Sequence, residues 1–180
     1  MVDLKITELD ALTTVLGEDL LAIVDDPTGT ASTKKIRTDD FQRTWHVGCR
    51  VYHNADQSID NSSATKLAFN SEVFDTDTMH DNSTNNSRIT INTAGKYLFI
   101  FHGSWSAAAT LDGQFTFLLN NTTTLGWERQ AGQIASTIAA IVDCAVTNYM
   151  EVSVSQTSGG ALNMRYLAEY SAYFYAQRVG

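Results

Sequence analysis

The chain has 180 residues, of which 43% are hydrophobic and 18% are charged. This balance excludes a disordered acidic tail, and the length is sufficient to bury one sizeable core with a small additional segment. The formal net charge is −8 and the Lys and Arg residues form no cluster. A surface that neutralises phosphates is therefore excluded, and we expect no nucleic-acid partner.

Cysteine usage and hydropathy exclude further classes. Cys49 and Cys144 lie far apart, without a CxxC pair or a histidine-rich neighbourhood. We therefore expect two buried free thiols and neither a zinc site nor a disulfide framework. No run approaches the roughly 20 apolar residues that cross a bilayer, and no secretion signal opens the chain. We expect no membrane partner, and synthesis and assembly in a cytoplasm.

The first 44 residues differ in composition from the rest. Ile6, Leu9 and Leu12 recur at helical spacing, which predicts a turn or two of helix. The apolar run at 20–24 ends in an Asp, Pro and Gly turn, and 32–38 alternates as a partner strand would, so this part predicts a β-hairpin. Because so small a unit cannot be stable alone, we expect residues 1–44 to pack on another copy or on a larger surface.

The hairpin carries a resemblance in its residues 21–26, 29–30, 33–36 and 39–41, which read LAIVDD, GT, TKKI and DDF. They resemble the short amino-terminal modules of bacteriophage virion proteins. The resemblance implies that residues 1–44 form an anchoring module, docked on the major capsid protein or another virion structural protein. The anchoring residues that we predict are Leu20, Leu21, Ile23, Val24 and Ile36.

From residue 45 to residue 180 the pattern is that of strands separated by Asn, Ser, Thr and Gly clusters. In the segments 113–120 and 149–156, apolar and polar residues alternate, which places one face of each strand in a core. About nine strands with this period predict an all-β fold, an antiparallel jelly-roll β-sandwich. The predicted strands are 47–53, 65–69, 87–91, 95–105, 113–120, 134–146, 149–156, 162–167 and 170–177.

This half also carries a resemblance, in the order and spacing of short motifs. They are GCRV at 48–51, DTD at 75–77, HD at 80–81, GKY at 95–97, NN at 120–121, Gln156 with GG at 159–160, and YSAYF at 170–174. The segment resembles the trimeric jelly rolls of the complement globular-head and tumour necrosis factor-like superfamily. It departs from them at Thr147-Asn148, where relatives often have Gly-Asp. The resemblance implies a homotrimer that presents surfaces, and no enzymatic activity.

The loop at 75–81 contains three carboxylates and an imidazole. Asp75, Asp77 and Asp81 are candidate ligands for Ca²⁺, the one cofactor that the sequence suggests, because Ca²⁺ binds clustered oxygens. The spacing has neither the central Gly nor the terminal Glu of an EF-hand. Asp side chains also accept hydrogen bonds from the backbone just after them, so a solvated Asx turn is the alternative.

The end of the chain is rich in aromatic residues. Alternation places Phe174 and Ala176 on a core face, and Tyr173 and Tyr175 on the opposite face. An aromatic outer face indicates an interface, although a surface loop could also cover it. Because this strand lines the threefold axis in the trimers that the chain resembles, the resemblance implies a trimer interface here. Its predicted residues are Tyr166, Tyr170, Tyr173 and Tyr175.

We predict no catalytic residues, because none of His46, His53, His80 and His102 lies in a known nucleophile motif. The Asn-rich loops 61–63, 82–87 and 120–124 are either sugar-binding or simply solubilising turns. Trp105 and Trp127 are expected in the core or at an interface.

Together the two resemblances imply a homotrimeric, non-enzymatic structural protein on a virion surface, assembled in the host cytoplasm. The expected role is that of a bacteriophage capsid decoration protein or a short head fibre, attached through residues 1–44. The alternative is the receptor-binding tip of a tail fibre, which recognises a host surface glycan or protein through the Asn-rich loops.

Overall fold

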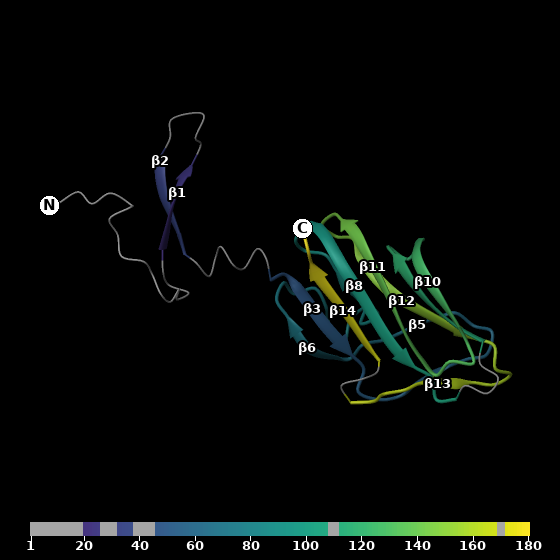
Figure 1. Ribbon diagram of the computed structural model, residues 1–180. Coiled ribbons are helices and arrows are strands. Elements are labelled where there is room, and N and C mark those ends of the chain that lie inside the picture. The colour runs from purple at the N-terminus through teal and green to yellow at the C-terminus, as the bar shows by residue number, and fades with distance from the viewer. Residues whose placement is uncertain (1–19, 26–31, 38–45, 108–111, 169–171) are drawn as a thin grey trace. The chain divides into compact units, whose positions relative to one another are not determined.

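The computed structural model describes residues 20–25, 32–37, 46–107, 112–168 and 172–180 (Figure 1). The chain divides into two compact units, Met1–Trp45 and His46–Gly180. Along the described residues, no helix is long and apolar enough to cross a membrane.

The first unit contains the expected hairpin. Strand β1 (Leu20–Asp25) pairs antiparallel with strand β2 (Ser32–Arg37), and the register aligns Leu21 with Ile36 and Val24 with Thr33. All five predicted anchoring residues belong to these two strands: Leu20, Leu21, Ile23, Val24 and Ile36. The predicted helical turns before residue 20 lie outside the described residues.

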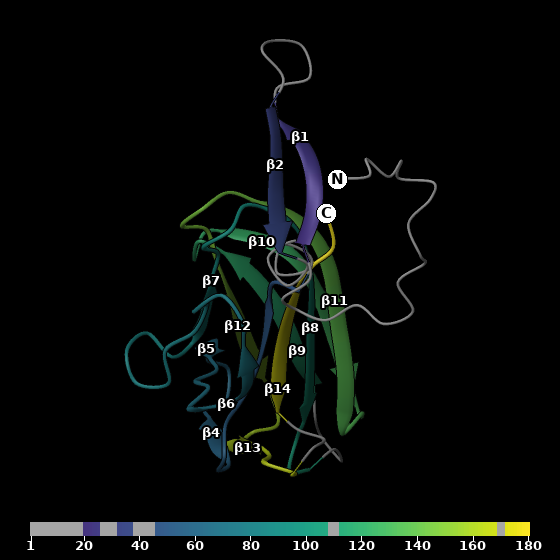
Figure 2. The ribbon, with the colours of Figure 1, turned by 90° about the vertical axis from the view of Figure 1, so that its left-hand side faces the viewer.

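The second unit is a sandwich of two five-stranded antiparallel sheets (Figures 1 and 2). One sheet, which we name the inner sheet, has the order β11-β8-β14-β3-β6. The other, which we name the outer sheet, has the order β10-β9-β12-β5, with β7 also paired to β12. A small sheet of β13 and β4 completes the unit. The strands are β3 (Gly48–Tyr52), β4 (Gln57–Ile59), β5 (Thr65–Lys66), β6 (Ser71–Asp75), β7 (Arg88–Thr90), β8 (Gly95–Ser104), β9 (Asp112–Leu119), β10 (Thr123–Ala131), β11 (Ala135–Cys144), β12 (Tyr149–Gln156), β13 (Leu162–Met164) and β14 (Tyr173–Arg178).

The core lies between the two sheets and is rich in aromatic rings. Phe174 of the inner sheet packs against Phe99 in the same sheet and against Phe117 of the outer sheet, with ring centroids 6.1 and 5.8 Å apart. Phe101 and Phe115 meet edge to face at 5.0 Å across the sandwich. All five side chains are fully buried. The alternation of β9, β12 and β14 is thus confirmed, because one face of each strand fills the core.

Packing explains the GKY motif at 95–97, one of the motifs that carry the resemblance. A Cβ atom on Gly95 would lie 2.5 Å from the carbonyl oxygen of Gly180 and 2.4 Å from Nε of Arg178, so only glycine lets the carboxyl-terminal residues pass this close. Two residues later, the hydroxyl of the buried Tyr97 donates a hydrogen bond to the carbonyl oxygen of Thr93 at 2.6 Å. This motif therefore fixes the start of β8 against the end of the chain.

Some predicted elements differ from the structure. The nine-residue β10 was not predicted, because only Gln130 among its residues is buried and its sequence does not alternate. β5 and β13 are also shorter than the segments 65–69 and 162–167. Trp105 belongs to the core as expected, whereas Trp127 is 61% exposed on β10 and is no part of the core.

Candidate functional site

The inner sheet has one face in the core and one face that points away from it. The face that points away from the core carries a continuous row of side chains. In the register of the antiparallel strands, Tyr175 of β14 stands opposite Ile100 on one side and opposite Arg50 on the other. Ile100 in turn faces Ala139 of β11, and Arg50 faces Phe74 of β6. Because paired residues share a face of the sheet, these side chains line up across all five strands.

A second row lies beside the first. Tyr173 pairs with His102 and with Tyr52, and its ring stacks on His102 with centroids 5.6 Å apart. The Arg50 guanidinium lies over the Tyr173 ring at 4.8 Å, and Tyr52 stacks on Tyr166 at 6.4 Å. We name this surface the aromatic face. It comprises Arg50, Tyr52, Phe74, Ile100, His102, Ile141, Tyr166, Tyr173 and Tyr175.

Three residues of the aromatic face are exposed to solvent in the single chain, and the other six are partly buried. Ile141 is 68% exposed, Phe74 is 38% exposed and Tyr166 is 37% exposed. Such a contiguous apolar and aromatic surface, backed by a packed sheet, is typical of an interface. Of the four residues predicted for a trimer interface, Tyr166, Tyr173 and Tyr175 lie on this face, and Tyr170 lies outside the described residues.

The titratable groups His102 and Tyr175 in the middle of the aromatic face are neutral, and Arg50 carries the charge there. Burial lowers the pKa of His102 from its usual 6.5, so the imidazole is neutral at neutral pH, and its Nδ1 lies 2.7 Å from Oγ1 of Thr137. Burial and the nearby Cys49 raise the pKa of Tyr175, whose hydroxyl donates to Oε1 of Gln177 at 3.0 Å. Neutral, hydrogen-bonded side chains can be covered by another protein at little desolvation cost.

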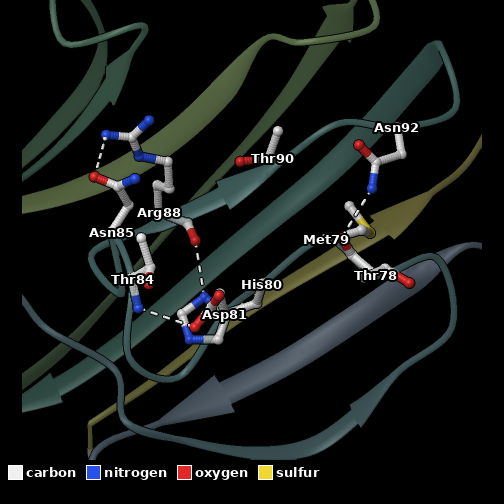
Figure 3. Close-up of a pocket in the computed structure, with 9 residues that line it drawn as sticks. All are labelled: Thr78, Met79, His80, Asp81, Thr84, Asn85, Arg88, Thr90 and Asn92. Carbon is white, nitrogen blue, oxygen red and sulfur yellow. Dashed lines mark hydrogen bonds between the residues drawn. The ribbon is translucent and has the colours of Figure 1, made fainter.

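The acidic loop forms backbone turns. The Asp75 carboxylate accepts hydrogen bonds from the backbone N–H groups of Asp77 and His80 at 3.1 and 2.9 Å. The Asp81 carboxylate accepts from the N–H of Thr84 at 2.9 Å (Figure 3). It also accepts from the N–H of Ser83 at 2.9 Å and from the Ser83 hydroxyl. These bonds lower the pKa of Asp81 to about 2. The described residues contain no group of three His, Cys, Asp or Glu side chains placed to hold a metal ion. The bonds of Asp75 and Asp81 to backbone N–H groups are those of Asx turns, the alternative that the sequence left open.

His80 ties this loop to the sandwich. Its Nδ1 lies 2.8 Å from the carbonyl oxygen of Arg88 (Figure 3). Its Nε2 lies 2.9 Å from the carbonyl oxygen of Phe69. A cavity of about 400 Å³ opens beside it, lined by residues of the loop and of β7. The Arg88 side chain crosses this region, donating to Oδ1 of Asn85 at 3.1 Å and lying 4.2 Å from the centre of the Tyr149 ring. Both ring nitrogens of His80 are thus engaged by the fold.

The cysteines are poor candidates for nucleophiles. Burial, with Asp75 and Glu72 nearby, raises the pKa of the Cys49 thiol well above its usual value. Burial and Asp143 raise the pKa of Cys144 to about 11. A reactive cysteine needs a lowered pKa that supplies the thiolate, so both thiols are structural. They are free and buried, as predicted.

Comparisons with known proteins identify the fold. No family model and no curated protein matches the chain. Among solved structures, murine APRIL matches with a TM-score of 0.56 and 10% identity, over 74% of this chain and 99% of that one. Eiger TNF from S. frugiperda matches with a TM-score of 0.55 and 10% identity, over 75% of this chain and 93% of that one. The globular domain of zebrafish complement 1qA protein matches with a TM-score of 0.50 and 14% identity, over 74% of this chain and 98% of that one.

These similarities show that the chain contains a tumour necrosis factor-like jelly roll, as the order of motifs predicted. They give no support to a bacteriophage origin. Sequence reasoning also missed most of the aromatic face. Arg50, Phe74, Ile100 and Ile141 come from four different strands, and only the sheet order brings them together. Alternation along each strand could have marked these residues as pointing away from the core. Only the order of the strands shows that they are neighbours.

Proposed function

We propose that this protein is a non-enzymatic homotrimer that buries the aromatic face between its subunits. The aromatic face is the observation that carries the proposal, because the single chain leaves Ile141, Phe74 and Tyr166 in water beside stacked tyrosines. The number three comes from the family that the sequence resembles. A closed ring of three copies is a symmetric solution that leaves no apolar surface for further growth.

The substitution Ile141→Glu tests this proposal. Because Ile141 is 68% exposed, the change should alter the stability of a single subunit by less than about 0.5 kcal/mol. In a trimer, it would place three carboxylates in an apolar interface, which costs several kcal/mol per assembly. Sedimentation equilibrium should therefore show a trimer for the wild type and a monomer for the variant.

Val146→Glu serves as the matched control. Val146 is 51% exposed, but it lies in the turn between β11 and β12, outside the aromatic face. This variant should remain trimeric. A wild-type protein that sediments as a monomer, or an Ile141→Glu variant that stays trimeric, would contradict the proposal.

The finer role that we propose is a capsid decoration protein or a short head fibre on a virion, with β1 and β2 as the docking element. The support is the resemblance of residues 1–44 to phage virion modules and the presence of the hairpin that this resemblance implies. Three hairpins on one trimer would convert weak single contacts into firm attachment through effective concentration. The acidic net charge of −8 would keep neighbouring trimers apart and soluble.

Electron cryomicroscopy of particles with and without the protein tests this role. Many copies around capsid axes, lost in the variant Leu21→Asp, would support decoration through the hairpin. A few copies at the tail tip would favour the alternative, a receptor-binding tip. Particles that carry no copy would contradict both roles, while the trimer proposal would still stand on sedimentation.

A further inference from the structure

His102 is the only residue of the aromatic face whose side chain ordinarily changes its charge near neutral pH, because arginine stays protonated and tyrosine titrates at about pH 10. Its imidazole stacks on the Tyr173 ring, with centroids 5.6 Å apart and planes inclined by 25°. Towards β11, its Nδ1 lies 2.7 Å from Oγ1 of Thr137. These contacts hold the ring against the sheet between β14 and β11, so a subunit that covers the aromatic face also covers the imidazole.

The one permanently charged side chain of the aromatic face is a cation. Strands β8 and β3 flank β14 (Figure 1), and the Arg50 guanidinium of β3 lies over the Tyr173 ring at 4.8 Å. Tyr173 thus contacts His102 from the strand on one side and Arg50 from the strand on the other. Protonation of His102 would place two positive charges around one ring, and like charges repel more strongly where protein has displaced water.

The carboxylates of the neighbouring elements lie away from His102. On the outward side of β11 the acidic residue is Asp143, opposite Lys96 of β8 and roughly 20 Å further along the strand. Beyond β3, the Asp56 carboxylate accepts a hydrogen bond from the N–H of Tyr166 at 2.7 Å. Within the described residues, burial alone shifts the pKa of His102, and no charged group contributes. A proton on His102 therefore finds no counter-ion in its own subunit.

We propose that the aromatic face is a pH-sensitive interface, which the uptake of one proton by each His102 opens in mild acid. This switch rests on the homotrimer proposed above and gives it a release signal. The assembled state covers three neutral imidazoles. In the released state each imidazolium returns to water, which solvates its charge.

The direction of the switch follows from where the proton binds more readily. Burial lowers the pKa of His102 from 6.5 even in the single chain. Covering the face removes more water and leaves Arg50 nearby, so the pKa should be lower still in the trimer. The free subunit then binds more protons, and the full affinity is present above 6.5 and is lost as the pH falls below it. Each proton contributes up to about tenfold per pH unit, so three histidines can lower the association constant of the trimer about a thousandfold per pH unit.

Sedimentation equilibrium of the full chain at about pH 7.5 and about pH 5 tests the switch, since histidine titrates between these values and most carboxylates do not. The wild type should be a trimer at the higher pH and a monomer at the lower pH. His102→Gln keeps a polar side chain that takes up no proton, so it should be trimeric at both. His102→Lys carries the charge throughout and should be monomeric at both. His46→Gln is the matched control: His46 is exposed and precedes β3, outside the aromatic face, so this variant should respond as the wild type does.

The outcomes separate the switch from the trimer on which it rests. A wild-type protein that stays trimeric at both pH values would overturn the switch and leave the trimer standing. A wild-type protein that is monomeric already at the higher pH would refute the trimer, and the switch with it. If His102→Gln dissociated at the lower pH as the wild type does, another group would be the sensor and the proposal would be wrong.

A direct titration replaces His102→Gln if that variant does not fold. NMR of the imidazole C–H signal of His102 gives its pKa in the wild-type trimer and in the monomeric Ile141→Glu variant. The pKa should be lower in the trimer. An equal or higher value there would overturn the proposal, because protonation would then not oppose assembly.

Discussion

Replacing Lys66 by Met should destabilise the jelly roll, because it leaves a carboxylate buried without its cation. Glu151 of β12 is only 1% exposed, and its Oε2 lies 2.6 Å from Nζ of Lys66. The other oxygen, Oε1, accepts a hydrogen bond from the Ser87 hydroxyl at 2.7 Å. Met keeps most of the Lys66 stem, so packing changes little while the charge is lost.

The magnitude follows from what remains around Glu151. Removing one partner of a fully buried ion pair costs about 3–5 kcal/mol. Here the Lys66 side chain is 37% exposed, so water can approach, and the Ser87 bond persists. We therefore expect a loss of about 2 kcal/mol in the free energy of unfolding, which corresponds to about 6–10 °C in Tm for a domain of this size.

Urea denaturation at fixed protein concentration measures this loss, with Lys96→Met as the control, because Lys96 is exposed on β8. The double variant Lys66→Met with Glu151→Gln should recover at least about 1 kcal/mol, since it removes the unpaired charge and keeps an acceptor for Ser87. A loss below about 0.5 kcal/mol, or a double variant no more stable than the single one, would refute the reasoning.

Three further predictions concern loops. Thr147 has a φ of 73°, which a β-branched residue rarely adopts. Thr147→Gly should therefore raise the free energy of unfolding, measured by urea denaturation, by about 0.5–1 kcal/mol. An unchanged or lower stability would contradict this. Because hydrogen bonds lower the pKa of Asp81 to about 2, its contribution is present above about pH 4 and lost as pH falls towards 2. Asp81→Asn should therefore flatten the stability profile in that window, and an unchanged profile would count against the turn. An excess of Ca²⁺ should leave Tm unchanged, because the carboxylates of Asp75 and Asp81 accept hydrogen bonds from backbone N–H groups; a rise in Tm would support the calcium prediction instead.

The sequence was informative where a local pattern decides the structure. The predicted strand 149–156 has the same bounds as β12, and its inward residues Met150, Val152 and Val154 are buried as alternation predicts. Glu151 on the opposite face is buried as well, which alternation does not predict. The sequence was uninformative for β10, which is held by its pairing with β9 and buries little. Propensity cannot find such a strand, because tertiary pairing and not its own side chains keeps it extended.

The contrast between local patterns and tertiary pairing also decides which parts of the candidate sites could be predicted from the sequence. Tyr173 and Tyr175 could be assigned to an outer face from alternation alone, but their neighbours Arg50 and Phe74 depend on the order of the strands.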